Sequence, residues 1–505
     1  MSYADFEARM AQVNDLLSVL NLLAWDARTQ MPSGGVVTRG QQVATITALA
    51  RDLVTGDAMQ RAIEGARAEV SGDPIRQRAL DQAARDIGTL SRVPAELISE
   101  AAELKTVAHS AWVDARAKND FAAYAPVLER MFAIQHKIAD AIGYADHPYD
   151  AMLALYEPDM TLAQLEPTFD TLKAALVPLI ERALSVPAPR QDFLSRSYPI
   201  AAQKAFGLRI AEKFGYDMNR GRLDDTIHPF EISFTRNDVR ITSRWRENWL
   251  PGGFFALWHE AGHAMYEQGA APEITRTIFA TDVVNLYAVA GASFGMHESQ
   301  SRLWENRVGR SCEFWELHFG ALRDTFPEQL ADVTAEEFWR SVNAVRPDYI
   351  RVEADELTYD LHIILRSEIE AAVMTGEAKV SDLPGLWAER MKSYLGRDVP
   401  NDTLGVLQDV HWSHGYVGSF PTYTLGNIMG AQFFDAALKE SAIATGLETG
   451  DYAPLRGWLT ENIYRHGRAS SPAETLQRVT GGPLDTAPYI ARLTDKVDAL
   501  TGVSR

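Results

Sequence analysis

The chain has 505 residues, and its 49 Lys and Arg against 68 Asp and Glu give a formal net charge of −19. Binding to nucleic acid or to an anionic membrane needs a positive protein surface, so this acidic balance argues against both kinds of partner. Cys312 is the only cysteine, which excludes an internal disulfide and a thiolate metal cluster and is typical of a reducing compartment. The first residues lack the pattern of a secretory signal, and no run of about 18 apolar residues predicts a membrane span. We therefore predict an acidic, soluble, cytoplasmic protein.

Helical periodicity runs through most of the chain, because apolar residues recur three and four positions apart with charged residues between them. The clearest segments are 6–23, 94–117, 162–184 and 350–375. Pro and Gly gather in short clusters, and neither a long linker nor a repeat of about 20–50 residues separates the halves. We predict an all-α fold in one large domain over 1–505. Its N-terminal helical lobe covers roughly 1–225, a core with the motifs described below roughly 226–430, and C-terminal helices roughly 431–505.

One stretch departs from the helical pattern. Residues 231–242 alternate in period two on either side of Asn237 and Asp238, which predicts a small β-hairpin. The hairpin could be a plain surface feature, or its edge strand could hold an extended peptide by backbone hydrogen bonds. Its place about twenty residues before the motif described next favours the second interpretation.

The motif is His-Glu-x-x-His, in a run at 254–268 that is apolar enough to be helical. On a helix, His259 and His263 lie one turn apart on one face, so both imidazoles can reach the same metal ion. Neutral imidazole suits zinc, and a catalytic zinc site needs one more protein ligand and a water. Glu260 points to the side where that water would sit, and could take its proton and pass it to a leaving amine.

The motif has two interpretations other than a zinc site. The two histidines could merely share a buried helix face. Gly262 argues against this, because a glycine inside a helix costs about 1 kcal/mol relative to Ala and usually marks close approach of a ligand or another backbone. Glu260 and His263 also have the spacing of a di-iron helix motif. Such bundles need a second Glu-x-x-His, which the sequence lacks.

The third ligand must come from a second helix. Positions 266 and 269 hold Tyr and Gly, where the longer metzincin motif needs Gly and His. Glu267 shares the helix face, but about 12 Å of helical rise from His259 is too far for one ion, so it is predicted to lie outside the ligand set. The best candidate is Glu298, near the start of a helix. On its own, Glu298 could equally be a first-turn carboxylate that the helix dipole favours.

These residues lie in a longer pattern that resembles the carboxypeptidase Taq family of metallocarboxypeptidases over nearly the whole chain. The five matching signatures, in chain order, are Asp-Val-Arg-Ile-Thr at 238–242, His-Glu-Ala-Gly-His at 259–263, His-Glu-Ser-Gln at 297–300, Ile-Arg-Val-Glu-Ala-Asp at 350–355 and Gly-Val-Leu-Gln-Asp-Val-His-Trp at 405–412. Segments 23–26, 31–32 and 420–427 also look like family segments.

The resemblance implies an all-α, neurolysin-like peptidase architecture with a long deep cleft, a small hairpin or sheet near the active site, and a homodimer. It implies release of C-terminal residues from peptides with broad side-chain tolerance and poor cleavage when the last residue is Pro. It also implies zinc, with cobalt as a substitute, held by His259, His263 and Glu298, with Glu260 as general base. The segment at 275–290 looks longer than the usual family connection, which bears on substrate preference.

An enzyme that removes C-terminal residues must recognise a free carboxylate, and the arginine fork matches it best. Arg351 is the first candidate, because the resemblance assigns its signature to substrate binding. It could instead be a helix-surface residue paired with Asp355. Arg240 and Arg244 are reserve candidates that could equally be plain hairpin cations.

The oxyanion of the reaction needs hydroxyl or imidazole donors. Tyr423 and His411 are the candidates, with His228 as a weaker one that could also contact substrate. Each could instead be a buried, hydrogen-bonded side chain. His411 and His414 have no third ligand nearby in the sequence, so they do not predict a second metal site.

The sequence thus predicts a zinc metallocarboxypeptidase that acts on peptides with a free C-terminus. A helical metallo-oligopeptidase that cuts short peptides internally is the nearest alternative, and a need for the free carboxylate separates the two. A catalytically silent helical scaffold that kept the motif is the other, and stoichiometric metal binding would argue against it.

Overall fold

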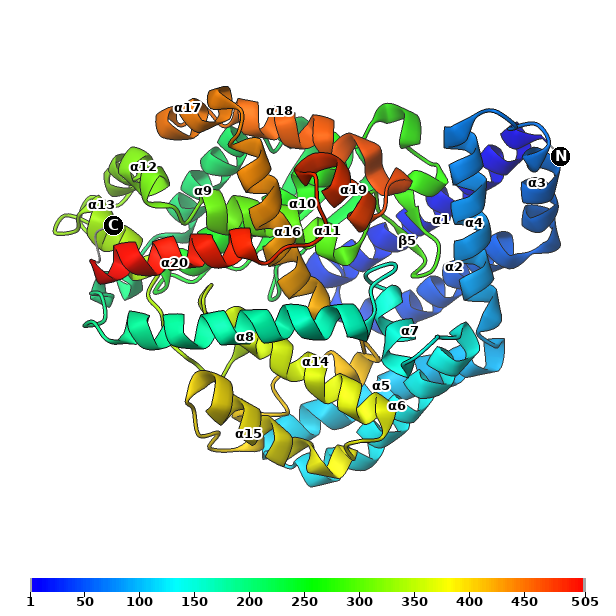
Figure 1. Cartoon of the computed structure of the whole chain (residues 1–505), viewed down its shortest axis with the longest axis horizontal. Coiled ribbons are helices and arrows are strands. Elements are labelled where there is room, and N and C mark those ends of the chain that lie inside the picture. Colours follow the sequence, from blue (N-terminus) through cyan, green and yellow to red (C-terminus); the bar gives the residue numbers. More distant parts are fainter. Residues whose placement is uncertain (1, 503–505) are drawn as a thin grey trace. The chain divides into compact units, whose positions relative to one another are not determined.

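The computed structural model describes residues 2–502, and most of them are helical (Figure 1). The chain forms two compact units, and each draws on three separate stretches. The first unit holds the stretch that ends at Ser91 together with Pro189–Val342 and Met429–Leu484. The second unit holds Arg92–Ala188, Asn343–Ile428 and the stretch that begins at Asp485.

Helices make up most of both units. Those of the first unit are α1 (Tyr3–Thr29), α2 (Val36–Thr55), α3 (Asp57–Arg67), α4 (Pro74–Arg92), α9 (Ile200–Phe214), α10 (Leu250–Gly269), α11 (Phe294–Arg302), α12 (Cys312–Thr325), α13 (Ala335–Val342), α17 (Ser441–Thr449), α18 (Ala453–Asn462) and α19 (Pro472–Thr480). Those of the second unit are α5 (Ala95–Lys118), α6 (Phe121–Ile142), α7 (Pro148–Ala154), α8 (Leu162–Leu184), α14 (Tyr359–Thr375), α15 (Leu383–Leu395), α16 (Pro421–Ala437) and α20 (Ala487–Thr501). Helix α16 begins in the second unit and ends in the first.

The predicted all-α class is confirmed, and helices α1, α5 and α8 confirm the segments predicted at 6–23, 94–117 and 162–184. The long deep cleft and the single domain over 1–505 stay predictions. The two compact units are interleaved along the sequence, and the three consecutive parts also stay a prediction.

The helix predicted at 350–375 is wrong in its first part. The chain makes a short 3-10 turn at Arg351–Glu353, and α14 begins only after it. Asp355 accepts hydrogen bonds from the backbone N–H and the hydroxyl of Thr358, at 3.2 and 2.8 Å. Such local bonds between a side chain and the backbone compete with helix formation, so apolar spacing alone places the helix start too early.

The predicted hairpin is confirmed and belongs to a three-stranded sheet in the first unit. Its strands are β2 (Glu231–Thr235) and β3 (Asp238–Ser243), which pair antiparallel. The third strand, β1 (Gly221–Asp225), pairs parallel with β3, so β3 is central. The sequence of β1 is mostly charged and shows no alternation, so its pairing depends on contacts distant in the chain.

Helix α10 lies in the core of the first unit, with α9, α11 and the strands β2 and β3 packed around it. Most of its residues are buried, and apolar side chains make up most of the helix outside the metal motif. Trp258 is fully buried, and its indole N–H donates to the backbone oxygen of Gly207 at 3.0 Å. Its ring packs on Phe254 and Phe314, at 5.8 and 5.3 Å between centroids. The residue before the metal motif is thus held rigidly.

The segment at 275–290 is anchored on α1. The side-chain N–H of Asn14 donates to the hydroxyl of Thr281 at 2.8 Å, and that of Asn21 donates to the backbone oxygen of Ala288 at 3.1 Å. The segment forms the two-residue strands β4 (Thr281–Asp282) and β5 (Tyr287–Ala288). Its apolar residues join the core beside α1 through Ile278, Phe279, Val283 and Ala288. This connection is therefore an ordered part of the first unit.

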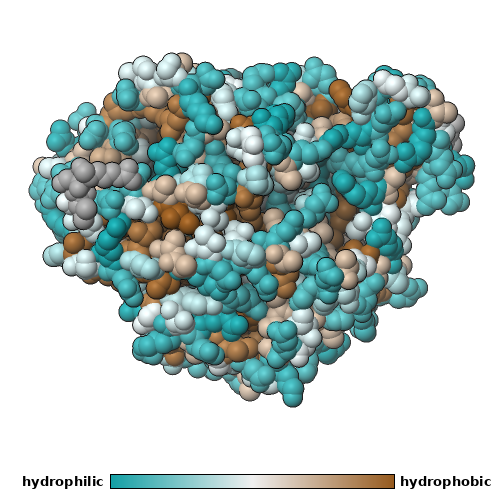
Figure 2. All heavy atoms as spheres, in the orientation of Figure 1, coloured by the Kyte–Doolittle hydropathy of each residue, from teal (hydrophilic) through white to brown (hydrophobic). Residues whose placement is uncertain are grey.

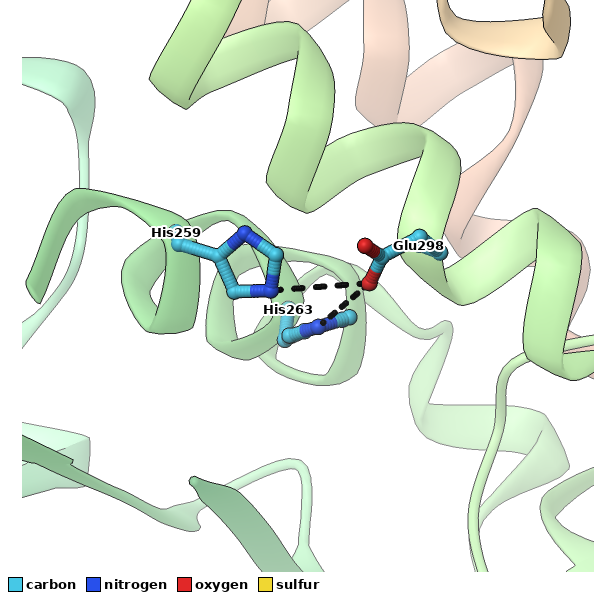
Figure 3. A group of neighbouring side chains, drawn as sticks. All are labelled: His259, His263 and Glu298. Carbon is cyan, nitrogen blue, oxygen red and sulfur yellow. Dashed lines mark ion pairs between the residues drawn. The ribbon is translucent and has the colours of Figure 1, made fainter. Parts of the chain in front are cut away.

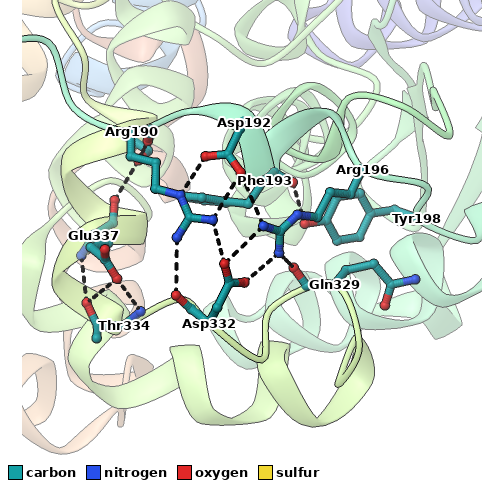
Figure 4. A network of polar contacts seen from close by, with 10 residues as sticks. Arg190, Asp192, Phe193, Arg196, Tyr198, Gln329, Asp332, Thr334 and Glu337 are labelled. Carbon is teal, nitrogen blue, oxygen red and sulfur yellow. Dashed lines mark hydrogen bonds and ion pairs between the residues drawn. The ribbon is translucent and has the colours of Figure 1, made fainter.

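An arginine–aspartate network fixes the segment where the chain returns to the first unit (Figure 4). Arg190 and Arg196 both reach Asp332, which lies between α12 and α13, at 2.5 and 2.6 Å. Asp192 accepts a further bond from Arg190 at 2.5 Å. These groups are largely exposed, so the paired geometry positions the segment more than it stabilises the fold.

The face drawn in Figure 2 is covered mainly by hydrophilic side chains, with apolar ones in scattered groups. Among residues 2–502, none of the helices combines the length and the apolar character that crossing a membrane requires.

Candidate metal centre

The His-Glu-x-x-His motif lies in the middle of α10, where α11 crosses it closely. Gly262 makes the crossing possible, because a Cβ at this position would stand 2.6 Å from the backbone oxygen of Gln300 and 2.7 Å from Cα of Ser301. The reason predicted for a glycine inside this helix, close approach of another backbone, is confirmed. The crossing brings Glu298 of α11 to the histidine face of α10.

Three donor atoms converge at the crossing (Figure 3). Nε2 of His259 and Nε2 of His263 lie 3.5 and 3.3 Å from Oε2 of Glu298. The three ligand atoms lie within 4.8 Å of one another, and no second group of this kind occurs in the part of the chain that the structure describes. The two histidine side chains are 19% and 16% exposed.

Neighbours in α11 hold the carboxylate of Glu298. Its Oε1 accepts a hydrogen bond from Nε of Arg302 at 2.7 Å, and its Oε2 accepts one from the hydroxyl of Ser301 at 3.0 Å. Because α11 begins at Phe294, Glu298 lies in the second helical turn, and the alternative of a first-turn carboxylate favoured by the helix dipole is wrong.

The outward nitrogen of His259 has a carboxylate partner. Its Nδ1 lies 3.0 Å from Oε2 of Glu305, whose other oxygen accepts a bond from Arg310 at 3.0 Å. Glu305 lies on a π-helical turn, Leu303–Val308, that extends α11. Such turns are rare and frequent at functional sites. This one presents a carboxylate to a histidine ring that faces the metal position.

The outward nitrogen of His263 has a different partner. Its Nδ1 lies 2.6 Å from Nδ1 of His297, and Nε2 of His297 lies 2.9 Å from Oε1 of Glu267. Glu267 is buried and lies behind His297, outside the three-residue group that could hold an ion. This position agrees with the prediction that Glu267 is not a ligand.

The charges at the centre favour a cation. Burial alone would lower the pKa of His259, but Glu298 and Glu305 overcome it and raise that pKa to about 10. Burial would raise the pKa of Glu298, but His259 and Arg302 hold it well below its usual range. Burial lowers the pKa of His263 to about 3. Carboxylates thus lie at both nitrogens of His259, and a proton on this ring or a metal ion at its Nε2 can offset their charge.

The donor set fits a zinc-type ion. Two imidazole nitrogens and one carboxylate oxygen form the protein part of a known class of catalytic zinc site, which leaves a fourth position open. Both outward ring nitrogens have partners, as the histidine ligands of metal sites usually do. Magnesium and calcium prefer oxygen ligands and match this set less well.

Glu260 lies next to His259 on α10 and is only 7% exposed. Burial raises its pKa to about 7, although the charge of His259 and a backbone hydrogen bond from Glu231 act in the opposite direction. Glu231 begins β2, so the predicted hairpin does lie beside the metal motif. A carboxyl group with a pKa near neutrality can both accept and release a proton.

The chain is similar to known proteins over nearly its whole length. The model of the family described as "Carboxypeptidase Taq (M32) metallopeptidase" matches residues 5–497. The chain belongs to this family. Thermostable carboxypeptidase 1 of Thermus thermophilus is 39% identical over 505 aligned residues, with 96% of each chain covered. Carboxypeptidase 1 of Bacillus subtilis is 34% identical over 501 residues, with 98% of each covered. The crystal structure of the M32 carboxypeptidase from Deinococcus radiodurans R1 matches with a TM-score of 0.95 and 38% identity over 99% of both chains.

Membership of the carboxypeptidase Taq family makes this chain a metallocarboxypeptidase with peptide substrates, as predicted. The family implies a divalent metal, and the group on α10 and α11 could hold such an ion.

Other signatures of this carboxypeptidase Taq-family chain meet in the second unit, around Asp409. Arg351 is buried, and its Nε and Nη2 donate to Oδ1 of Asp409 at 3.0 and 2.9 Å. Nε of Arg366 donates to the other oxygen at 2.6 Å. Burial would raise the pKa of Asp409, but the two arginines hold it far below its usual range. The alternative of a helix-surface Arg351 paired with Asp355 is therefore wrong.

His411 and Tyr423 lie together near this cluster. Nε2 of His411 is 3.5 Å from the hydroxyl of Tyr423, and its ring packs on Phe420 at 4.4 Å between centroids. Burial and the charge of Arg351 lower the pKa of His411 to about 3, so its imidazole is neutral. Its Nδ1 is buried without a hydrogen-bond partner in the described chain. His414 instead pairs with His109 at 3.1 Å, and so does not join His411.

The reserve candidates of the first unit are less favourably placed. Nε of Arg240 donates to Asp238 at 2.9 Å, and the guanidinium lies over the ring of Trp25 at 4.3 Å. These contacts agree with the alternative of a hairpin cation. His228, in the loop between β1 and β2, and Arg244, which follows β3, are both exposed.

Sequence reasoning missed four partners of the predicted residues: Glu305, His297, Asp409 and Arg366. A signal existed for two of them, because His297 and Asp409 stand inside the signatures that supplied Glu298 and His411. The partnership of Glu305 depends on a π-helical turn that no periodicity predicts.

Proposed function

We propose that this enzyme releases single residues from peptides with a free C-terminus, with broad side-chain tolerance and weak activity on C-terminal Pro. His259, His263 and Glu298 would hold zinc, or cobalt in its place. The bound ion would supply a Lewis acid that activates water and polarises the scissile carbonyl. The observation that carries the proposal is the convergence of three metal-type donors in a member of a metallocarboxypeptidase family.

Glu260 is the proposed general base. It takes a proton from the attacking water and gives it to the departing amino group. Its burial supports this role, because a pKa raised to about 7 makes both transfers accessible near neutral pH. The position of Glu260 beside a ligand histidine also supports it.

Arg351 is the proposed recognition group for the C-terminal carboxylate, with Arg240 and His228 as secondary candidates. Asp409 and the hydroxyl of Tyr359 take three of the five N–H groups of Arg351, which leaves two for a second carboxylate. Its ring neighbours fix the guanidinium, since it lies 5.4 Å from the Tyr423 ring centroid.

Tyr423 and His411 are the proposed oxyanion donors. Both lie close to Arg351, and the His411 imidazole and the Tyr423 hydroxyl lie 3.5 Å apart as a pair of polar groups. We also propose that the enzyme works as a homodimer in the cytoplasm. The family resemblance and the single cysteine support this assembly and location.

The test compares one peptide as its free C-terminal acid and as its C-terminal amide, with zinc, with cobalt and with chelator. We expect single-residue release from the acid only, lost with chelator and reduced by about 10²- to 10⁴-fold in Glu260→Gln. Equal internal cleavage of both peptides would instead indicate an oligopeptidase and remove the role given to Arg351. No cleavage despite bound metal would contradict the proposed activity.

A further inference from the structure

We propose that His297 is a positioning residue that fixes the tautomer and the orientation of His263, so that Nε2 of His263 presents its lone pair to the metal position. The proposal rests on the ligand role given to His263 in the proposed function. It assigns a role to a histidine that directly precedes Glu298 and points away from the metal position, toward Glu267.

Glu267 determines the direction of the hydrogen bonds in this chain of residues. Its carboxylate accepts the backbone N–H of Ala290 at 3.0 Å, the backbone N–H of Gly291 at 3.0 Å and the hydroxyl of Ser233 at 3.2 Å. Backbone N–H groups can only donate, so Glu267 is an acceptor throughout. Nε2 of His297, 2.9 Å from the same carboxylate, must therefore carry the proton of that bond.

The tautomers of His297 and His263 follow from this assignment together with the ligand role of His263. A metal ligand needs a lone pair on Nε2 of His263, so that ring carries its proton on Nδ1. Nδ1 of His297 therefore accepts, and Nδ1 of His263, 2.6 Å away, donates. His263 then carries its proton on Nδ1 and its lone pair on Nε2, the atom that faces Glu298 at 3.3 Å. The opposite tautomer would leave the ligand nitrogen protonated and unable to bind metal.

Packing holds the His297 ring in this place. It stacks on Tyr266, at 5.2 Å between centroids and 24° between planes. On another side is Gly291, where a Cβ would stand 2.2 Å from Cδ2 of His297. Because a real Cβ cannot come so near, glycine at 291 makes room for the ring while its N–H holds Glu267.

The two ligand histidines are therefore oriented by different means. His259 has a direct carboxylate, Glu305, at 3.0 Å. His263 reaches its carboxylate, Glu267, through a second imidazole. Partners behind histidine ligands usually contribute about 10- to 100-fold to metal affinity. Loss of the His297 nitrogen should have an effect of this size, although His297 is not a ligand.

The experiment measures zinc affinity of the full-length protein by competition with a chromophoric chelator, beside thermal melting of the metal-free form. His297→Phe keeps a ring to stack on Tyr266 and removes both nitrogens. Gly291→Ala removes no polar group and displaces the His297 ring. His318→Phe is the matched control. That buried imidazole also packs on an aromatic ring, at 4.5 Å, and bonds a tyrosine hydroxyl at 2.8 Å, on α12.

We expect about 10- to 100-fold weaker zinc binding in His297→Phe and in Gly291→Ala, and no change in His318→Phe. With cobalt in place of zinc, the visible absorption bands should shift in the first two variants only. Unchanged affinity in either folded variant would overturn the proposal, as would an equal loss in His318→Phe. Failure of the unaltered protein to bind one zinc per chain would instead contradict the proposed function.

Discussion

The backbone oxygen of Gln300 lies 2.6 Å from the point where a Cβ at residue 262 would stand. Only Gly262 therefore lets α11 approach α10 closely enough for Glu298 to meet the two histidines. A residue without a side chain, and with no chemistry of its own, thus sets the geometry of the metal centre.

Gly262→Ala should separate the two helices at their crossing. Overpacking of this kind costs about 1–3 kcal/mol, and the displaced Glu298 should weaken zinc binding at least about tenfold. The matched control is Gly320→Ala in α12, where an added Cβ meets no atom within 4 Å. This control should gain up to about 1 kcal/mol from helix propensity. Unfolding in urea and chelator competition measure both effects, and equal behaviour of the two variants would refute this account of Gly262.

Asp409→Asn should strongly destabilise the fold. The substitution removes the carboxylate that Arg351 and Arg366 share and leaves two buried cations without an anion. Breaking a buried ion pair from one side costs about 3–5 kcal/mol. Asp398→Asn makes the same chemical change at an exposed pair with Lys392, and should have little effect. Urea unfolding of both variants checks the difference.

Arg351→Lys should reduce the preference for a free C-terminal acid over the amide by at least about tenfold, because lysine cannot form the paired bonds of the arginine fork. Arg366→Lys is the control. It alters the same ion cluster, but its arginine is wholly buried and cannot reach a peptide. The ratio of kcat/KM for the acid and the amide is the measurement. A similar fall of that ratio in both variants would indicate a disturbed cluster and not lost recognition.

The free energy of unfolding should fall between pH 7 and pH 5 because of His318. Burial, helped by the nearby Lys213 and Arg209, lowers the pKa of His318 to about 4. The unfolded chain takes up a proton below its usual pKa of about 6.5 while the folded chain does not, so stability falls as pH drops from 7 to 5. Allowing for partial solvent contact, the loss is about 1–2 kcal/mol. His318→Phe should show a loss smaller by that amount in urea unfolding at the two pH values.

Sequence reasoning found the residues whose arrangement depends only on their spacing along one helix. His259, Glu260 and His263 follow from helix geometry, and Gly262 was singled out because a glycine is costly there. The residues alone make Glu298 only a candidate ligand, because the helix crossing that places it beside α10 is a tertiary contact. The resemblance to the family strengthens that prediction.

Contacts distant in the chain account for what sequence reasoning missed. Strand β1 is mostly polar, and its backbone pairing with β3 makes it part of the sheet. The segment before α14 has helical spacing, but Asp355 bonds the backbone locally and delays the helix. For Arg351, pairing with Asp355 four residues away was only the alternative interpretation, and no local pattern indicates its partner Asp409, which is 58 residues away.

The most direct test of the central claim is a titration of metal-free protein with zinc, with release of the C-terminal residue followed at each addition. The account predicts that activity rises in proportion to added zinc and stops rising at one ion per chain, and that His263→Ala shows no such rise. Full activity before any metal is added, or a rise that is the same in His263→Ala, would contradict it.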